Sequence, residues 1–283
     1  MRVLLDTKGM LVVYKPPDMA HHSEADKPGL MSALRDAQLN GDIQHPGRLY
    51  PAHRLDKHTS GAIVLAKSKD AARVLEVAFR TRNVKKLYVA LSQRKPLKKQ
   101  GRVRGDMVRS RRGQWMLTRG VTHPATTHFC SEPVGGRHAF VLRPTTGRTH
   151  QLRVALKSLG APVLGDPRYA AASASRHDRM YLHSACLRLP REAALADEGE
   201  VLDVVCAPAE GRHFVSCDFV EWFGRAFGSL SLSNGVGVES SGGVESGGSV
   251  SSTWFGGTVV SVPRPSSNSF MLSECISSQA SAS

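Results

Sequence analysis

The stretch AHRLDKHTSGAIVLA, residues 52–66, decides how this chain is organised. It places one carboxylate, Asp56, between two cations and follows it with Thr-Ser-Gly at 59–61 and an apolar run. The run is rich in β-branched residues, so it predicts a buried strand over 61–66. A loop attached to a buried strand holds its side chains in fixed positions. Asp56 is therefore the first candidate for a chemical role, although loops that only turn a corner can have the same composition.

On either side of this stretch, the chain predicts further strands and helices. Strands are expected at 10–14, 87–91 and 139–142. Ser68 is expected to cap a helix with one apolar face. That face consists of Ala71, Val74, Leu75, Ala78 and Phe79.

A second helix is expected to begin at a Thr149 cap and to end at Gly160. Its leucines, at 152, 156 and 159, share one face, and Arg153 falls on the opposite face with His150 and Lys157. The chain has no internal repeat and no regular βαβ series. The sequence therefore predicts an α+β fold with a mixed, mostly antiparallel sheet and flanking helices, rather than a doubly wound parallel sheet.

The chain carries an excess of positive charge. Its 283 residues include 38 Lys or Arg and 24 Asp or Glu, a formal net charge of +14. Thirteen of the cations and a single acid, Asp106, lie between Arg80 and Arg112. Like charges this dense repel one another, so they favour contact with nucleic-acid phosphates over a merely solvated surface. The residues expected to make this contact are Lys98, Lys99, Arg111 and Arg112.

Several other kinds of site are absent from the sequence. It contains no P-loop, no dinucleotide-binding glycine motif and no His-Glu-x-x-His. His53 and His58 flank Asp56, but only a helix would bring them together and the residues at 59–61 predict a loop, so no metal site is expected. The five cysteines are scattered without a Cys-x-x-Cys pair and are expected to be reduced thiols.

The two ends of the chain differ in composition. No apolar run approaches the roughly 20 residues of a membrane span, and the N-terminus does not resemble a signal peptide. A soluble, cytoplasmic chain is expected, with an organelle or the nucleus left open. Residues 228–283 include 18 Ser and 9 Gly and carry a net charge of minus two. They predict a flexible coil that follows a domain of residues 1–227. Within this coil, Trp254 and Phe255 are expected to be ordinary tail residues and not a docking motif.

Five blocks of sequence, in this order, resemble the RluA-type pseudouridine synthases. They are HRLDKHTSG at 53–61, KKLYVAL at 85–91, GRTHQLRVAL at 147–156, PVLGDPRY at 162–169 and LHSACLRL at 182–189. LVVYKPPDMAHHS at 11–23 is also similar to that family's first strand and lysine-proline loop, so the resemblance covers about residues 10–210. It implies a pseudouridine synthase fold, whose mixed sheet is split by a central catalytic cleft. It also implies isomerisation of uridine to pseudouridine in ribosomal or transfer RNA, without metal or organic cofactor.

The resemblance further implies catalytic roles. Asp56 corresponds to the family's catalytic aspartate, which attacks the ribose or the uracil ring or removes a ribose proton. A carboxylate in a cleft needs a fixed cation to stay ionised, and Arg153 of the HQLR block supplies one whose planar fork can hold a carboxylate at two points. Tyr88 of the K-x-Y block is expected to lie against the target base and to assist proton removal at C5.

The remaining implied roles concern substrate binding. A uridine within folded RNA must leave its stack to reach a cleft. Arg54 is expected to occupy the vacated stack or to grip the flanking phosphate, and His53 and Leu182 complete the expected substrate-binding set. The residues at 59–61 are expected to set the backbone of the aspartate loop, with Gly61 leaving room for close approach.

Three features depart from the family pattern. Asp18 stands where the family usually has glycine, and LYVAL continues into SQRKPLKKQG without the usual glycine. The chain also begins at the first expected strand, without the small S4 RNA-binding domain of many relatives. Target choice is therefore expected to rest on the insertion at 94–115.

The expected partner is RNA, and the chain is expected to be a monomer that binds neither DNA nor a membrane. Two alternatives from other classes remain. One is a catalytically silent RNA-binding protein of the same fold, which would not need Asp56, Tyr88 and Arg153 together. The other is a hydrolase of bases or sugars that uses the same aspartate.

Overall fold

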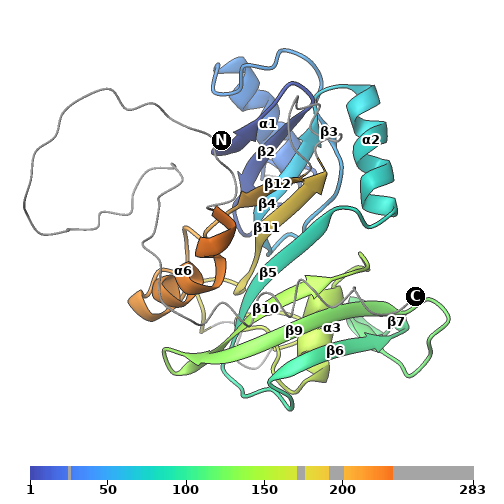
Figure 1. Ribbon diagram of the computed structural model, residues 1–283, viewed down its shortest axis with the longest axis vertical. Helices are drawn as coiled ribbons and strands as arrows, with labels where there is room; N and C mark the ends of the chain where they lie inside the picture. Colours follow the sequence, from blue (N-terminus) through green and yellow to red (C-terminus); the bar gives the residue numbers. More distant parts are fainter. Residues whose placement is uncertain (25–26, 171–175, 191–200, 232–283) are drawn as a thin grey trace, which may run out of the picture.

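The computed structural model describes residues 1–24, 27–170, 176–190 and 201–231 (Figure 1). Its ten-stranded sheet consists of β1 (Val3–Asp6), β2 (Met10–Lys15), β3 (Tyr50–Pro51), β4 (Ser60–Ala66), β5 (Lys85–Ser92), β6 (Gln100–Gly105), β9 (Ala125–Val134), β10 (Arg137–Pro144), β11 (Leu182–Pro190) and β12 (Val201–Val205). The main path runs β1-β2-β4-β11-β5-β10-β9-β6, while β3 pairs with β4 and β12 with β11. A separate hairpin is formed by β7 (Met107–Arg109) and β8 (Trp115–Leu117).

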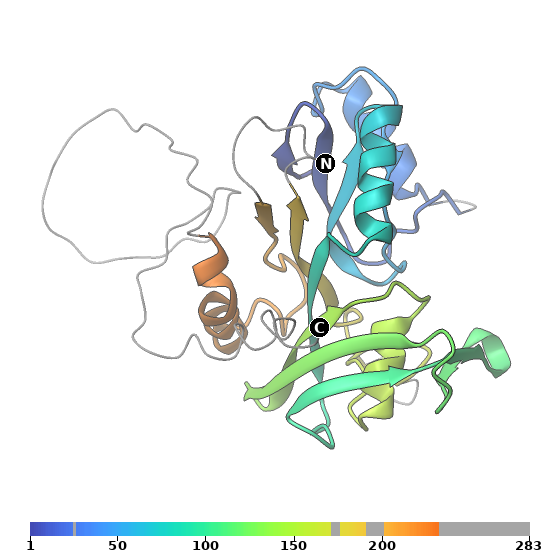
Figure 2. The same cartoon turned by 45° about the vertical axis from the view of Figure 1, so that its right-hand side comes forward.

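The helices flank this sheet. They are α1 (Leu30–Leu39), α2 (Lys69–Arg80), α3 (Gln151–Ser158) and α6 (Cys217–Ser231), with a short 3-10 turn, η1 (Arg111–Gly113), between β7 and β8. Figures 1 and 2 show α2 and α6 on opposite sides of the sheet, while α3 packs against the half that contains β9 and β10. All pairings of the described strands are antiparallel except that between β4 and β11. The expected α+β class with a mixed, mostly antiparallel sheet is confirmed.

The expected strands are present because both of their faces are buried. In β2, Leu11 and Val13 belong to one apolar cluster and Met10 and Val12 to another, so the strand reads as a continuous apolar run. The first cluster also contains Leu30 and Leu34 of α1 and the leucines of α3. Buried residues of α2 belong to the second cluster, and a third is built around the aromatic residues of α6. None of the described helices has the length and apolar character needed to cross a membrane.

The helix after β4 begins as predicted, with a narrower apolar face. The Ser68 hydroxyl accepts a hydrogen bond from Ala71 N at 3.1 Å, which caps α2. The side chains of Ala71, Leu75 and Ala78 are buried, whereas Val74 is 38% exposed. Only the inner part of the predicted apolar stripe therefore faces the core.

The predicted Thr149 cap of α3 is wrong. The residue before the helix is His150, in a left-handed conformation (φ 58°), and no side chain caps the first turn. The turn is instead held by Gln151, whose Oε1 accepts from Arg148 N at 3.0 Å and from the Thr146 hydroxyl at 2.7 Å. The buried Gln151 amide thus fixes the turn before the helix, while Thr149 is exposed and caps nothing. The end of the helix is as predicted, since Gly160 follows it with φ 74°.

Two elements lie outside the sequence predictions. β1 precedes the strand predicted to be first, and α6 continues to Ser231, beyond the predicted domain boundary after residue 227. The aromatic residues of α6 recur at helical spacing and would have revealed it: they are Phe219, Trp222, Phe223 and Phe227. Cys130, Cys186, Cys206 and Cys217 are free thiols. Trp254, Phe255 and Cys275 lie outside the described residues.

Candidate active site

A cleft of about 1440 Å³ opens beside β5 and contains the residues singled out in the sequence. Its lining includes Asp56, Tyr88, Arg153, Leu182, His53 and Arg54. The acidic residues of this lining are Asp56 and Glu76, whereas ten of its residues are Lys or Arg. Those cations are Arg54, Arg80, Arg82, Lys85, Lys86, Arg102, Arg104, Arg143, Arg148 and Arg153. A polyanion would therefore be drawn into the cleft, and the Asp56 carboxylate lies in a strongly positive field.

The backbone of the aspartate loop is fixed where β4 meets β11. Thr59 N donates to Asp56 O at 3.0 Å, which closes a tight turn directly before β4. Gly61 then pairs in parallel with Ser184, with φ 115°. A Cβ added at Gly61 would lie 2.3 Å from Ser184 O, so no other residue fits. The predicted close approach at Gly61 is confirmed.

A buried polar network secures the strand behind this turn. The Ser60 hydroxyl lies 2.8 Å from His183 Nδ1 and accepts from Arg179 Nη2 at 2.5 Å. His183 Nε2 lies 2.8 Å from Cys206 O, a carbonyl that can only accept, so Nε2 carries the proton and Nδ1 accepts from Ser60. Burial lowers the pKa of His183 to about 3, which keeps the ring neutral as this pattern requires. Ser60 is thus held from two elements.

Asp56 and Arg153 face each other in the cleft, at the end of a chain of charges. Arg153 Nη1 lies 3.4 Å from Asp56 Oδ2, which is the longest contact of the guanidinium. Its two short bonds, both 2.8 Å, go from Nε and Nη2 to the carboxylate of Asp166. The predicted two-point hold is therefore made on Asp166 and not on Asp56. The side chains of Arg153 and Asp166 are 2% and 0% exposed, whereas that of Asp56 is 22% exposed.

This arrangement suits a reactive carboxylate. Asp166 neutralises and orients the buried guanidinium, and the pKa of Arg153 is raised by its bonds to Asp166 and by the charges of Asp166 and Asp56, in spite of burial. Asp56 keeps one cation beside it but is not locked by a two-point bond. It can therefore still approach a substrate.

Lys15 ties the loop after β2 to the aspartate loop. Its ammonium donates to Pro16 O and Met19 O, both at 2.8 Å, and to Lys57 O at 3.1 Å. Three carbonyl acceptors require three N–H donors, so the group is protonated here. Burial lowers the pKa of Lys15 to about 7, so the link weakens in alkaline solution.

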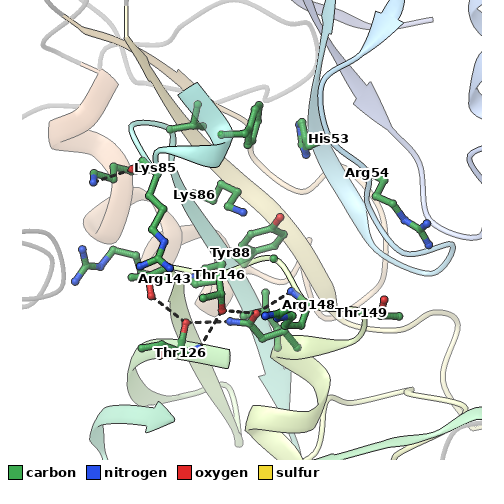
Figure 3. Close-up of a pocket in the computed structure, with 18 of the residues that line it drawn as sticks. His53, Arg54, Lys85, Lys86, Tyr88, Thr126, Arg143, Thr146, Arg148 and Thr149 are labelled. Atoms are coloured by element: carbon green, nitrogen blue, oxygen red, sulfur yellow. Dashed lines mark hydrogen bonds between the residues drawn. The ribbon is translucent and has the colours of Figure 1, made fainter. Parts of the chain in front are cut away.

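Tyr88 and Leu182 form the apolar floor of the cleft. Both are buried and belong to the same apolar cluster, and Ser184 stands opposite Tyr88 in the sheet. Burial and the charge of Asp56 raise the pKa of the Tyr88 phenol, so it stays protonated at neutral pH. Figure 3 shows Lys86 beside Tyr88, both from β5, with His53 and Arg54 across the cleft. Burial lowers the pKa of Lys86, which the sequence analysis did not single out.

His53 and Arg54 differ in their surroundings. The His53 ring stacks on Phe79 at 4.9 Å, and its Nε2 accepts from Val64 N at 3.1 Å. Burial lowers the pKa of His53 to about 3, so the imidazole is a neutral acceptor in a structural bond. Arg54 is exposed at the cleft. Only Arg54 is free to move with a substrate.

The basic run divides into two groups. Six cations of the run line the cleft, four from the end of α2 to the start of β5 and two from β6. They are Arg80, Arg82, Lys85, Lys86, Arg102 and Arg104. The four predicted RNA contacts, Lys98, Lys99, Arg111 and Arg112, are exposed but do not line it. A one-dimensional charge count could not separate the groups, because the sheet brings β6 near the cleft and leaves the two flanking turns outside.

Asp18 has a conformational cost and a compensating contact. Its φ of 60° lies in the left-handed region, which explains why glycine suits this position. Its carboxylate lies 2.5 Å from His58 Nδ1, so it joins the loop after β2 to the aspartate loop a second time. The side chains of Asp18 and His58 are 57% and 34% exposed, which makes the contact a weak one.

An Asp18→Gly protein is expected to be as stable as the wild type or slightly more stable. Glycine relieves a left-handed conformation that costs an L-residue about 1 kcal/mol, and the exposed ion pair contributes about 0.5 kcal/mol. Thermal unfolding checks this. Asp18→Ala is the matched control: it removes the ion pair but keeps the strain, so it should unfold at a lower temperature. A marked loss of stability in Asp18→Gly would mean that the His58 contact dominates.

The histidines near Asp56 do not converge on one point. His53 faces Phe79 and His58 faces Asp18. Within the described ranges, no three His, Cys, Asp or Glu side chains lie close enough to hold a metal ion.

Asp166 and Lys15 are the site residues that the sequence reasoning missed. Asp166 belongs to the PVLGDPRY block and Lys15 to the KPPD loop, so both lie in stretches that resemble the family. A charged residue directly beside an apolar run was the available signal. Fully buried charges are rare unless they are paired.

Comparison with known proteins agrees with this geometry. Residues 9–158 match the RNA pseudouridylate synthase family. An uncharacterized RNA pseudouridine synthase of Haemophilus influenzae is 36% identical over 216 residues, which cover 75% of this chain and 90% of that protein. The dual-specificity RNA pseudouridine synthase RluA of Salmonella typhi is 33% identical over 196 residues, 68% of this chain and 87% of that protein.

A solved structure extends the likeness to the fold. Human RNA pseudouridylate synthase domain containing 4 superposes with a TM-score of 0.60 at 27% identity, over 76% of this chain and 90% of that one. The sequence match and the superposition each cover about three quarters of this chain. The chain therefore belongs to the RluA-type RNA pseudouridine synthases, isomerases that convert uridine in RNA to pseudouridine.

Proposed function

We propose that this enzyme turns a uridine of ribosomal or transfer RNA out of its stack and isomerises it with Asp56 as the catalytic residue. The observation that carries this proposal is the Arg153 to Asp56 contact of 3.4 Å at the base of a cleft with ten lining cations. Asp56 is the partly exposed carboxylate of that contact, and Asp166 is wholly buried. Of the two carboxylates that contact Arg153, only Asp56 can therefore reach a substrate.

The reaction breaks the bond between the ribose C1′ and N1 of uracil and joins C1′ to C5. The proton on C5 is lost, and N1 acquires one. We assign the charge-dependent step to the Asp56 carboxylate, which acts on the sugar or the base, with the Arg153 guanidinium beside it. Tyr88 supplies an apolar ring for the extracted base to lie against. Because its phenol has a raised pKa, it is better suited to donate a hydrogen bond than to act as a resting base.

Extraction of the base needs a group that compensates the vacated stack. Arg54 is exposed next to the aspartate and has no ion pair among the described contacts, so it is available for this role. Unstacking costs a few kcal/mol. Contacts with flanking phosphates, from the cations of the cleft, supply the compensating free energy.

The test is incubation of the purified protein with ribosomal RNA and, separately, with transfer RNA, followed by nucleoside chromatography. The name of the Salmonella relative, dual-specificity, is the reason to assay both. Pseudouridine should appear in at least one, and faster when the target uridine is unpaired, because extraction then costs less. Free uracil would indicate a hydrolase. Unchanged nucleosides with retained RNA binding would indicate the catalytically silent alternative.

Neutralising the two β6 arginines, as Arg102→Gln with Arg104→Gln, should weaken binding of a short target RNA. For each phosphate that is no longer neutralised, the slope of log K against log salt should fall by about 0.7 to 0.9. Both side chains are exposed, so thermal unfolding should hardly change. A salt titration measures the slope.

A second set of four substitutions is the matched comparison: Lys98, Lys99, Arg111 and Arg112, each replaced by Gln. These residues lie outside the cleft, and we propose that they contact only RNA that extends beyond the target site. Affinity for the short RNA should then be unchanged, and affinity for a longer RNA should fall. Unaltered affinity for both the short and the longer RNA would mean that these four residues are only solvated surface residues.

A further inference from the structure

The hairpin of β7 and β8 is attached to the loop that holds the catalytic arginine. Gln114 Nε2 donates to Arg168 O at 2.8 Å, and Arg168 Nη1 donates to Arg112 O at 3.0 Å. Trp115 N donates to the hydroxyl oxygen of Tyr169 at 2.9 Å. β8 also packs against α3, and Figure 1 draws β7 at this end of the molecule. The hairpin is therefore fixed to the two segments that define the position of Arg153.

Tyr169 joins these segments through three different groups. Its backbone N–H donates to Asp166 Oδ1 at 3.1 Å, on the carboxylate that grips Arg153. Its ring lies 5.1 Å from the Arg153 guanidinium carbon. Its hydroxyl lies 3.0 Å from Nδ1 of His150, the residue directly before α3 and three positions before Arg153. The side chain is 6% exposed, so these contacts are shielded from water.

The direction of the hydroxyl bonds follows from the chemistry of the partners. Trp115 N–H can only donate, so the Tyr169 oxygen accepts from it. Burial and the charge of Arg153 lower the pKa of His150, and a neutral ring leaves Nδ1 able to accept the phenol proton. The hydroxyl is thus satisfied on both sides and forms a continuous link from the hairpin to the start of α3.

We infer that the hairpin Met107–Leu117 positions Arg153 against Asp56, and that Tyr169 is the positioning residue through which it acts. The inference deepens the proposed function and rests on its assignment of the Arg153 and Asp56 pair. Arg153 approaches Asp56 at 3.4 Å, without the short two-point bond it makes to Asp166, so small displacements of the guanidinium change this contact most. An element that does not line the cleft thereby sets the catalytic geometry.

The first test is Tyr169→Phe, which keeps the ring and the N–H to Asp166 and deletes only the hydroxyl. We expect kcat to fall about three- to tenfold, the equivalent of one hydrogen bond, with KM for a short RNA within about twofold of wild type. Thermal unfolding identifies the folded fraction, to which kcat is normalised. A residue with a merely structural role would lower stability and leave the normalised kcat unchanged, and that result would overturn the inference. So would a rise in KM alone.

The second test removes the other end of the same bond. Trp115→Pro deletes the N–H, and Gln114, with φ −79° and ψ 165°, already has the backbone that a residue before proline needs. Its kcat should fall as in Tyr169→Phe, and the double variant should lose no more than the worse single variant. Trp115→Ala keeps the N–H and is the control for removal of the indole, so its kcat should fall less. If the double variant instead lost kcat by the product of the two single losses, the two groups would act independently and the shared link would be contradicted.

Two further variants distinguish a failure of this inference from a failure to fold and from a failure of the proposed function. If Trp115→Pro does not fold, Gln114→Ala replaces it, because it removes the neighbouring bond to Arg168 O. Asp56→Asn tests the catalytic assignment alone. Inactive Asp56→Asn together with full normalised kcat in Tyr169→Phe would refute the positioning role and leave the proposed function intact. Active Asp56→Asn would refute both.

Discussion

The Asp56→Asn enzyme is expected to release no C5 hydrogen from labelled uridine in RNA above background. Asparagine keeps the shape of the side chain but removes its charge and its basicity. The rate of hydrogen release is expected to fall by about a hundred- to ten-thousandfold, the range for a group that acts directly on a reacting atom. Folding should be retained, because Asp56 is 22% exposed and its one described ion pair is the 3.4 Å contact with Arg153. RNA affinity should be equal or slightly higher, since one negative charge has left a site that faces phosphates.

Glu76→Gln is the matched control for this substitution. Glu76 is the other acid of the cleft lining and is exposed, so the change removes the same charge from the same field. Its activity should stay close to that of the wild type. Appreciable hydrogen release by Asp56→Asn, in a preparation free of deamidated protein, would remove Asp56 from the mechanism. Equal losses in both variants would point to the field of the cleft and not to one carboxylate.

The Arg153→Met enzyme is expected to lose both activity and stability. Asp166 is 0% exposed and would be left without its cation, and breaking a buried pair in this way costs about 3 to 5 kcal/mol. The lower end is expected, because Asp166 Oδ1 keeps the backbone N–H groups of Arg168 and Tyr169. Denaturant unfolding measures the stability, and hydrogen release under conditions that keep the protein folded measures the activity.

Arg188→Met separates the two effects. Arg188 holds Asp203 at two points, at 2.7 and 2.6 Å, in the pairing of β11 with β12, and neither residue lines the cleft. This variant should also be destabilised, but its folded fraction should retain the activity of the wild type. Wild-type activity per folded molecule in Arg153→Met would show that Arg153 serves the fold alone and would overturn the pairing with Asp56.

The sequence by itself determined the class of fold and singled out the loop that carries Asp56. β2, β4, β5 and β10 are apolar on both faces, so each could be found from a short run of residues without knowledge of its partners. Ser68 likewise acts through local geometry as a helix cap, and it was predicted correctly. The close approach at Gly61 was also predicted, but its partner, Ser184 of β11, appeared only in the tertiary structure. The resemblance of five ordered blocks then carried Asp56, Tyr88 and Arg153 to one site, and they do line one cleft.

Only the tertiary structure decided how the charges of that site are paired. Asp166 lies 110 positions after Asp56, and nothing in its own block shows that its side chain is fully buried against Arg153. The same holds for Lys15, whose three carbonyl partners come from two loops. The basic run shows the limit most directly, since Arg102 lines the cleft and Lys99, three positions earlier, does not. Charge is a property of a residue, but its partner is set by long-range strand pairing and helix packing, which no local pattern records.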